Sequence, residues 1–126
     1  MTRRMFATIA AAAPLASGQV KKAPVGLELY SVRGELAKDD ISTVKTVAKI
    51  GYEVVEFFSP YFNWTANHAR EIRKVLDDAG VVCHSTHNNA NYFDEANLAK
   101  TIELNQIIGS KYAIAASAPR MAGIDG

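Results

Sequence analysis

The sequence contains KIGYEVVEFF at 49–58, DAGVVCHSTH at 78–87 and IIGSKYAIAA at 107–116. Their glycines, Gly51, Gly80 and Gly109, are 29 residues apart. Each glycine ends a helical apolar pattern, and an apolar, strand-like run follows it. Glycine just past a helix end adopts the left-handed conformation at no steric cost. The repeat therefore predicts strands that alternate with helices, which is the pattern of a parallel sheet.

The apolar pattern predicts four strands and three helices within one domain of 126 residues. The strands are expected at 25–32, 52–58, 81–87 and 111–116. The first helix should follow Asp39 and Asp40, whose negative charges suit a helix N-terminus. The second should begin after Thr65, a residue type that caps helices. The third is expected over 95–108, with three apolar side chains facing the core: Leu98, Ile102 and Ile108.

The arrangement of these strands favours part of a (β/α)₈ barrel over a doubly wound sheet. The first strand-to-helix turn, SVRGELAKDD at 31–40, has no glycine-rich phosphate-binding pattern. Polar residues collect at the C-terminal ends of the strands, where barrel active sites are built. A complete barrel takes about 250 residues for eight strand–helix units. We therefore predict a partial barrel with parallel strand order 1-2-3-4 and helices on one face only.

Residues 1–18 are predicted to be a signal peptide. Arg3 and Arg4 precede a short, alanine-rich apolar stretch with small residues near Ala16. The segment Thr2–Phe6 resembles the twin-arginine export motif. The expected location is the periplasm or the medium, reached by twin-arginine export. The remaining 19–126 would have no contact with the membrane.

Charge and cysteine content exclude several classes of partner and site. Removal of 1–18 would change the formal charge from +1 to −1, and no long basic run is present. Nucleic acid is therefore not an expected partner. A lone cysteine, Cys83, excludes an internal disulfide and a cysteine-based zinc cluster. Cys83 lies in an apolar strand, so we interpret it as a core residue and not as a nucleophile.

The segments VGLELYSVR at 25–33, IGYEVVEFF at 50–58 and TANHAREIRKVLDDAGVVCHSTH at 65–87 resemble the sugar phosphate isomerase/epimerase family with the xylose isomerase-like barrel. The helix that ends IIGSKYAIA at 107–115 extends this resemblance. It implies a TIM barrel that isomerises or epimerises a sugar or polyol with a divalent metal: Mn, Zn, Co or Mg. Relatives with this barrel include a DNA-repair endonuclease, dehydratases and aldolase-like enzymes.

The resemblance also implies that 19–126 is the N-terminal half of such a barrel. In the family's epimerases the metal ligands lie mainly on later strands, so we expect them beyond residue 126 and expect no metal in this chain alone. Catalysis by the full-length protein would abstract a proton next to a carbonyl. Two alternatives stay open: a non-catalytic sugar-binding or structural half-barrel, and a hydrolase or dehydratase of the same superfamily.

The candidate catalytic residues are His87 and Glu56. His87 ends the third strand in the family's Ser-x-His position, and a neutral imidazole suits metal ligation, acid–base work or sugar binding. Glu56 would bind sugar hydroxyls or hold a metal-bound water at the barrel mouth, or else be a solvated strand-end acid. His84 is expected on the face opposite to His87, and His68 is expected to be solvated on its helix.

The candidate substrate-binding residues are Tyr30, Glu28 and Trp64. Glu28 and Tyr30 share a strand face. Glu28 would contact substrate or be satisfied by a polar group of the next strand, and Tyr30 would hydrogen-bond a hydroxyl or pack in the core with its tip in water. Trp64 would stack on a sugar ring or pack over the barrel mouth. The open sheet edges predict self-association.

Overall fold

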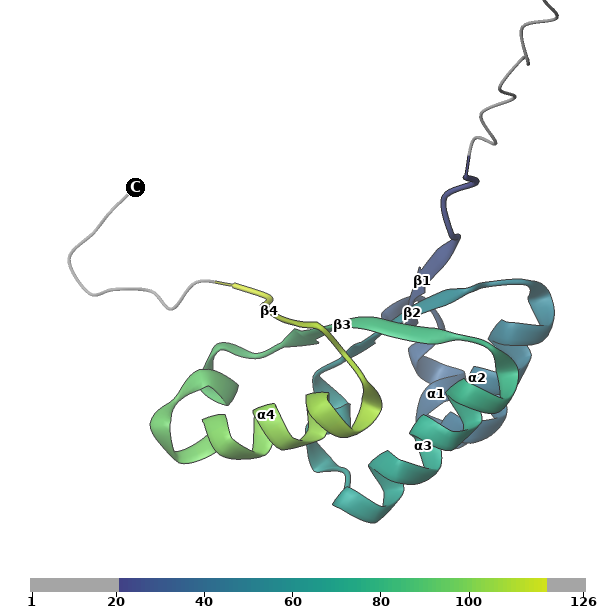
Figure 1. The fold of residues 1–126 in the computed structure, drawn as a ribbon. Helices are drawn as coiled ribbons and strands as arrows, with labels where there is room; N and C mark the ends of the chain where they lie inside the picture. Colours follow the sequence, from purple (N-terminus) through teal and green to yellow (C-terminus); the bar gives the residue numbers. More distant parts are fainter. Residues whose placement is uncertain (1–20, 118–126) are drawn as a thin grey trace, which may run out of the picture.

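A computed structural model describes residues 21–117, which form one parallel sheet backed by helices. The sheet has four strands in the order β1-β2-β3-β4, as predicted (Figure 1). These strands are β1 (Gly26–Glu28), β2 (Val54–Phe58), β3 (Val82–Asn88) and β4 (Tyr112–Ala115).

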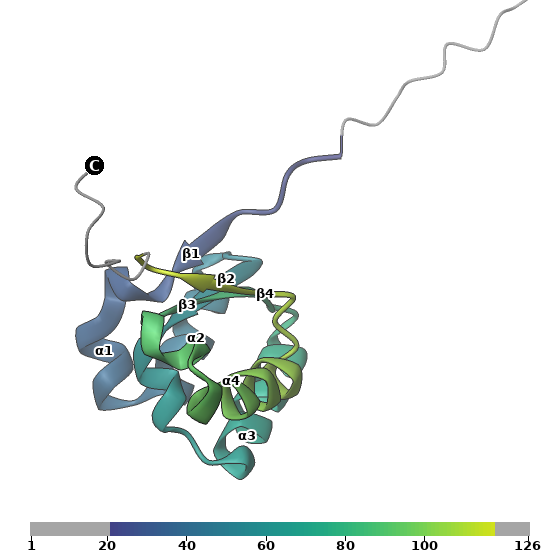
Figure 2. The same cartoon turned by 90° about the vertical axis from the view of Figure 1, so that its left-hand side faces the viewer.

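All the described helices lie on one face of the sheet (Figures 1 and 2). They are α1 (Arg33–Lys38), α2 (Asp40–Ile50), α3 (Ala66–Ala79) and α4 (Glu95–Ile108). Three single 3₁₀ turns follow strand ends: η1 (Leu29–Val32), η2 (Ser59–Asn63) and η3 (Ala90–Phe93). The three longer helices match the predicted ones. Helix α1 was not predicted, because it is only six residues long, contains Gly34 and has no side-chain cap.

The glycine repeat marks three helix ends, as expected. Gly51, Gly80 and Gly109 follow α2, α3 and α4 with φ angles of 114°, 68° and 78°. These angles lie in the left-handed region that glycine tolerates. At the other ends, the side chains of Asp39 and Thr65 accept hydrogen bonds from backbone N–H groups of α2 and α3. Local capping therefore fixes where each strand–helix unit changes direction.

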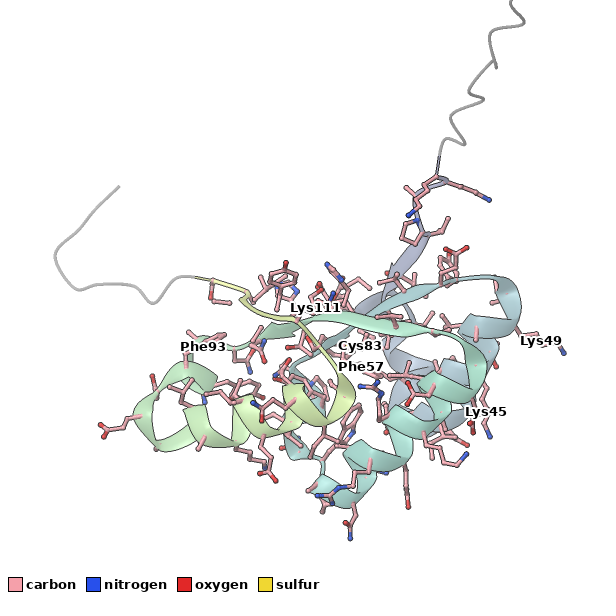
Figure 3. All side chains as sticks on the ribbon, in the orientation of Figure 1. Lys45, Lys49, Phe57, Cys83, Phe93 and Lys111 are labelled. Carbon is pink, nitrogen blue, oxygen red and sulfur yellow. The ribbon has the colours of Figure 1, made fainter. Side chains whose placement is uncertain are left out.

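The core lies between the sheet and the helices. Figure 3 shows Phe57 and Cys83 on the helix side, and both side chains are buried. Burial raises the pKa of the Cys83 thiol to about 12, which agrees with the interpretation of Cys83 as a core residue. The other fully enclosed apolar side chains of this core include Leu29, Val44, Val55, Tyr61, Ile72, Leu76, Leu104 and Ile108.

Two predictions about these elements are wrong. The first strand ends at Glu28, so Tyr30 lies in the turn η1 and not in a strand. On α4, Leu98 and Ile102 are 40% and 48% exposed. The buried side of α4 carries Thr101 and Asn105 as well as Leu104 and Ile108, because both polar side chains are hydrogen-bonded in the interior. Apolar spacing alone could not show this.

The predicted signal peptide, residues 1–18, lies outside the described residues and stays a prediction. Within 21–117, none of the helices combines the length and the apolar character that a membrane span requires.

Candidate functional site

Two carboxylates lie side by side on the sheet face turned away from the helices, which we call the open face. Glu28 ends β1 and pairs in register with Glu56 of β2. Side chains in register on neighbouring strands project to the same side of a sheet. The residues that flank Glu56, Val55 and Phe57, are buried against the helices, so Glu56 points to the open face.

A bulge in β3 places Ser85 beside Glu56. The pairing of β2 with β3 passes from Val55–Cys83 to Glu56–Ser85, which leaves His84 without a partner in β2. Ser85 Oγ donates a hydrogen bond to Glu56 Oε2. Because the bulge interrupts the alternation, His84 is exposed and borders the same shallow part of the open face as Ser85. The prediction that His84 lies opposite to His87 is therefore wrong.

His87 reaches the same place from the end of β3. Its Nδ1 atom lies 3.8 Å from Glu28 Oε1 and 3.9 Å from Glu56 Oε1. One possible ligand atom from each of the three residues lies within 4.8 Å of the other two. Exposed fractions of 39%, 40% and 24% for the side chains of His87, Glu28 and Glu56 leave the cluster reachable from solvent. These residues offer a metal ion two carboxylate oxygens and one imidazole nitrogen, although the family resemblance led us to expect no metal ligands in this chain.

Tyr30 joins this cluster through an adjoining hollow. Glu28, Tyr30, Phe58 and His87 line a hollow of about 240 Å³ at the ends of the strands. The Tyr30 ring stands edge-on to Phe58, with centroids 5.4 Å apart, and the guanidinium of Arg33 lies over the Tyr30 ring. Tyr30 is 51% exposed. Four of the five predicted site residues therefore gather at one end of the open face.

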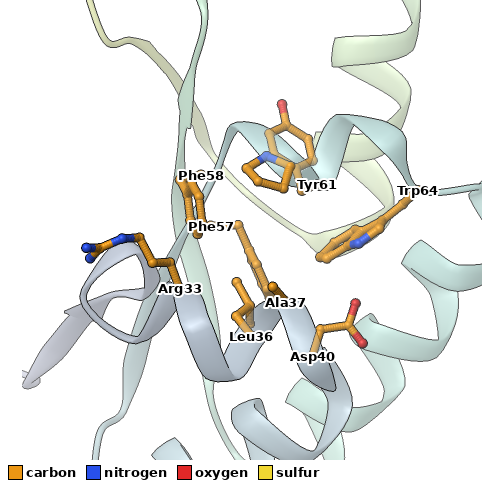
Figure 4. A pocket seen from close by; sticks show the side chains of 9 residues that line it. Arg33, Leu36, Ala37, Asp40, Phe57, Phe58, Tyr61 and Trp64 are labelled. Atoms are coloured by element: carbon orange, nitrogen blue, oxygen red, sulfur yellow. The ribbon is translucent and has the colours of Figure 1, made fainter.

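Trp64 lies elsewhere, on the helix side of the sheet. Its ring packs edge-to-face against Phe57, with centroids 5.0 Å apart, and against Tyr61 at 6.0 Å. Trp64 lines a separate cavity of about 200 Å³. Figure 4 shows its ring in the wall of this cavity with Phe57, Leu36 and Asp40. The structure thus packs Trp64 against core side chains on the helix side, and not beside His87.

A pair beside Trp64 was not predicted. His68 Nε2 lies 2.6 Å from Asp40 Oδ2, and the imidazole stands edge-on to the Trp64 ring. The hydrogen bond that His68 donates to Asp40 raises the pKa of His68 above its usual value, while partial burial opposes this rise. The pair joins α2 to α3 across 28 residues. Helical periodicity indicates which side of α3 His68 occupies but not which residue of α2 it meets.

A closed ring of hydrogen bonds lies beneath His87, on the helix side. Tyr61 Oη donates to Asn88 Oδ1, Asn88 Nδ2 donates to Thr86 Oγ1, Thr86 Oγ1 donates to Asn105 Oδ1, and Asn105 Nδ2 donates to Tyr61 Oη. All four side chains are buried. Thr86 and Asn88 flank His87 in β3, so the ring fixes the strand end that carries the imidazole. In the sequence, the only sign of this ring is that polar residues stand at positions of β3 and α4 that face the core.

Two crystal structures of sugar phosphate isomerase/epimerase proteins from Parabacteroides distasonis are similar to this chain. One has a TM-score of 0.55 and 22% identity, and the match covers 81% of this chain and 42% of that one. The other has a TM-score of 0.54 and 22% identity, and the match covers 77% of this chain and 42% of the other protein. No protein-family model and no curated protein matches the sequence. The chain therefore has the fold of part of a TIM barrel, and its match spans about 42% of the length of these structures.

Proposed function

We propose that this chain belongs to the sugar phosphate isomerase/epimerase barrels and supplies part of a site for a sugar or polyol. The observation that carries the proposal is the convergence of Glu28, Glu56 and His87 from three neighbouring parallel strands. Glu28 is the last residue of β1, His87 lies next to the end of β3, and Glu56 pairs in register with Glu28. In barrels of this kind, that end of the sheet is where substrates bind. The names of the similar crystal structures support the substrate class.

The proposed chemistry is proton abstraction from the carbon next to a carbonyl. Glu28 borders the hollow, and its second oxygen, Oε2, is the atom that would take the proton. Tyr30 also lines the hollow, and its hydroxyl would orient a substrate hydroxyl. Glu56, held by Ser85, and His87 would face the carbonyl end of the substrate. A divalent metal bound there would polarise the carbonyl oxygen.

Hydrogen–deuterium exchange into sugars tests this proposal even when the product is unidentified. The full chain is incubated with a panel of aldoses, ketoses and their phosphates in deuterium oxide, and NMR detects deuterium at the carbon next to the carbonyl. We expect incorporation with at least one sugar, and its loss in Glu28→Gln and His87→Gln. Glu53→Gln, an exposed glutamate just before β2, and His84→Gln serve as matched controls that should retain it.

Two results would overturn the proposal. One is the absence of exchange with every sugar tested, including sugars that bind, which would favour a sugar-binding half-barrel without catalysis. The other is exchange that continues unchanged in Glu28→Gln and His87→Gln, since the reaction would then take place elsewhere in the protein.

A further inference from the structure

We propose that Glu28, Glu56 and His87 bind one divalent transition-metal ion on the open face. This site differs from the ligands that the family resemblance places on later strands, because all three residues belong to β1, β2 and β3. The catalytic use of the ion rests on the proposed function. Its binding does not, because an ion can be titrated without any substrate.

The spacing of the three groups suits ligands that share an ion better than direct hydrogen bonds. At 3.8 and 3.9 Å from the two carboxylate oxygens, His87 Nδ1 is too far to be hydrogen-bonded to either. Two ligands that each lie about 2.1 Å from one ion are roughly 3–4 Å apart at ordinary coordination angles. Only small side-chain rotations would therefore bring these three atoms onto a common ion.

The local charge also favours a cation at this position. Glu28 and Glu56 are in register on neighbouring strands, where like charges repel. Among residues 21–117, no lysine or arginine forms an ion pair with either carboxylate. A divalent ion would neutralise both carboxylates at once, which the single imidazole of His87 cannot do.

The surroundings hold two of the three ligands in place. Ser85 donates to Oε2 of Glu56, and so leaves Oε1, the oxygen paired with His87, for an ion. The hydrogen-bonded ring of Tyr61, Thr86, Asn88 and Asn105 fixes the backbone on both sides of His87. Partners of this kind orient metal ligands and raise metal affinity.

The donor set indicates which ions would bind. Imidazole suits zinc and other transition metals, whereas magnesium and calcium prefer sites made of oxygen alone. Three protein ligands leave at least one coordination position open, which is typical of catalytic rather than structural zinc sites. We therefore expect Zn²⁺ and Mn²⁺ to bind more tightly than Mg²⁺.

Metal titration of the chelator-treated full chain tests the site. Zn²⁺ is titrated against a chromophoric chelator, and Mn²⁺ and Mg²⁺ are compared by calorimetry. We expect one Zn²⁺ per chain, at least about tenfold weaker binding in Glu28→Gln, Glu56→Gln and His87→Gln, and a smaller loss in Ser85→Ala. His84→Gln and Glu53→Gln are the matched controls and should bind like the unaltered protein. Circular dichroism checks that each variant is folded.

The inference is wrong if Zn²⁺ fails to bind at one per chain, or if the three ligand variants bind it as tightly as the controls. Unequal losses that spare His87→Gln would also overturn it, since the site would then be a carboxylate pair. Zn²⁺ binding without sugar exchange would leave this inference standing and reject the proposed function. Sugar exchange that survives complete removal of metal would support the proposed function and would show that the ion has no role in the reaction.

Discussion

Tyr61 shows how a single residue connects the core to the candidate site. Its hydroxyl donates to Asn88 and accepts from Asn105, and so joins η2 to both β3 and α4. Burial raises the pKa of the Tyr61 phenol, so the hydroxyl keeps its proton and remains a donor at neutral pH. Within the described residues, no buried side-chain nitrogen or oxygen atom lacks a hydrogen-bond partner. The ring is therefore a fully satisfied network.

We expect Tyr61→Phe to lower the free energy of unfolding by about 2 kcal/mol, because it leaves the buried Asn88 Oδ1 without its donor. Urea denaturation measures the change. Tyr112→Phe is the matched control, since Tyr112 is 57% exposed, and its effect should stay within about 0.5 kcal/mol. Equal effects of the two substitutions would show that the ring contributes nothing.

His68 predicts a pH dependence of stability. Asp40 raises the pKa of His68 in the folded state above the usual 6.5. The stabilisation by this pair is therefore full below about pH 6.5 and is lost as the pH rises through the higher folded-state pKa. We expect Asp40→Asn to lower the free energy of unfolding at about pH 5.5 and to have a smaller effect at about pH 8.5.

Asp78→Asn is the control for this experiment, because Asp78 pairs with a lysine, Lys74, and not with a histidine. Its effect should be small and the same at both pH values. An Asp40→Asn effect that stays constant or grows with rising pH would contradict the assignment of a charged pair.

At the scale of the elements, each of the three longer helices ends at a glycine in the left-handed conformation, and this is why the sequence predicted them. The 29-residue glycine repeat marks their C-terminal ends, and Asp39 and Thr65 mark two of the N-terminal ends. The bulge in β3 could not be predicted, because no glycine or other local signal marks it and only its pairing with β2 reveals it. Strand periodicity thus predicted that Glu56, Ser85 and His87 lie on the same face of the sheet, but it assigned His84 to the wrong face.

Substitution of the helix-ending glycines tests whether their left-handed conformation stabilises the fold. We expect Gly51→Ala and Gly109→Ala each to destabilise the protein by about 1 kcal/mol, since both have positive φ angles. A methyl group at Gly109 would also approach Arg73 Nη1, but the end of that side chain is flexible and can move away. Gly34→Ala in α1 should instead stabilise the protein by roughly 0.5–1 kcal/mol. The added methyl group at position 34 would have no neighbouring group within 4 Å. Thermal melts that gave all three substitutions the same sign would contradict this explanation.

At the scale of the whole molecule, the helices cover one face of the sheet and leave the other exposed. The exposed apolar side chains include Val82, Tyr112 and Ile114 on the strands. Within the described sheet, β1 and β4 each have one unpaired edge. Strand order and the layering of helices on the sheet follow from a local repeat, so the sequence predicted them. The exact site geometry depends on cross-strand register, which a single sequence does not contain.

These edges predict that the chain associates with itself when it is expressed alone. Sedimentation velocity should show residues 19–126 as dimers or larger species whose size increases with concentration. Ile114→Lys places a charge on the exposed strand β4 and should reduce association. Ile50→Lys, at the exposed end of α2, is the matched control and should not. A monomer at all concentrations that unfolds cooperatively would contradict the prediction.

The central claim is that three strands of this fold bring Glu28, Glu56 and His87 together as one site. Anomalous diffraction at the zinc edge, from crystals of the protein grown with Zn²⁺, tests it most directly. We predict a single strong peak about 2.1 Å from one oxygen of each glutamate and from one nitrogen of His87. Zinc bound only at other residues, or these three side chains pointing away from one another, would contradict it.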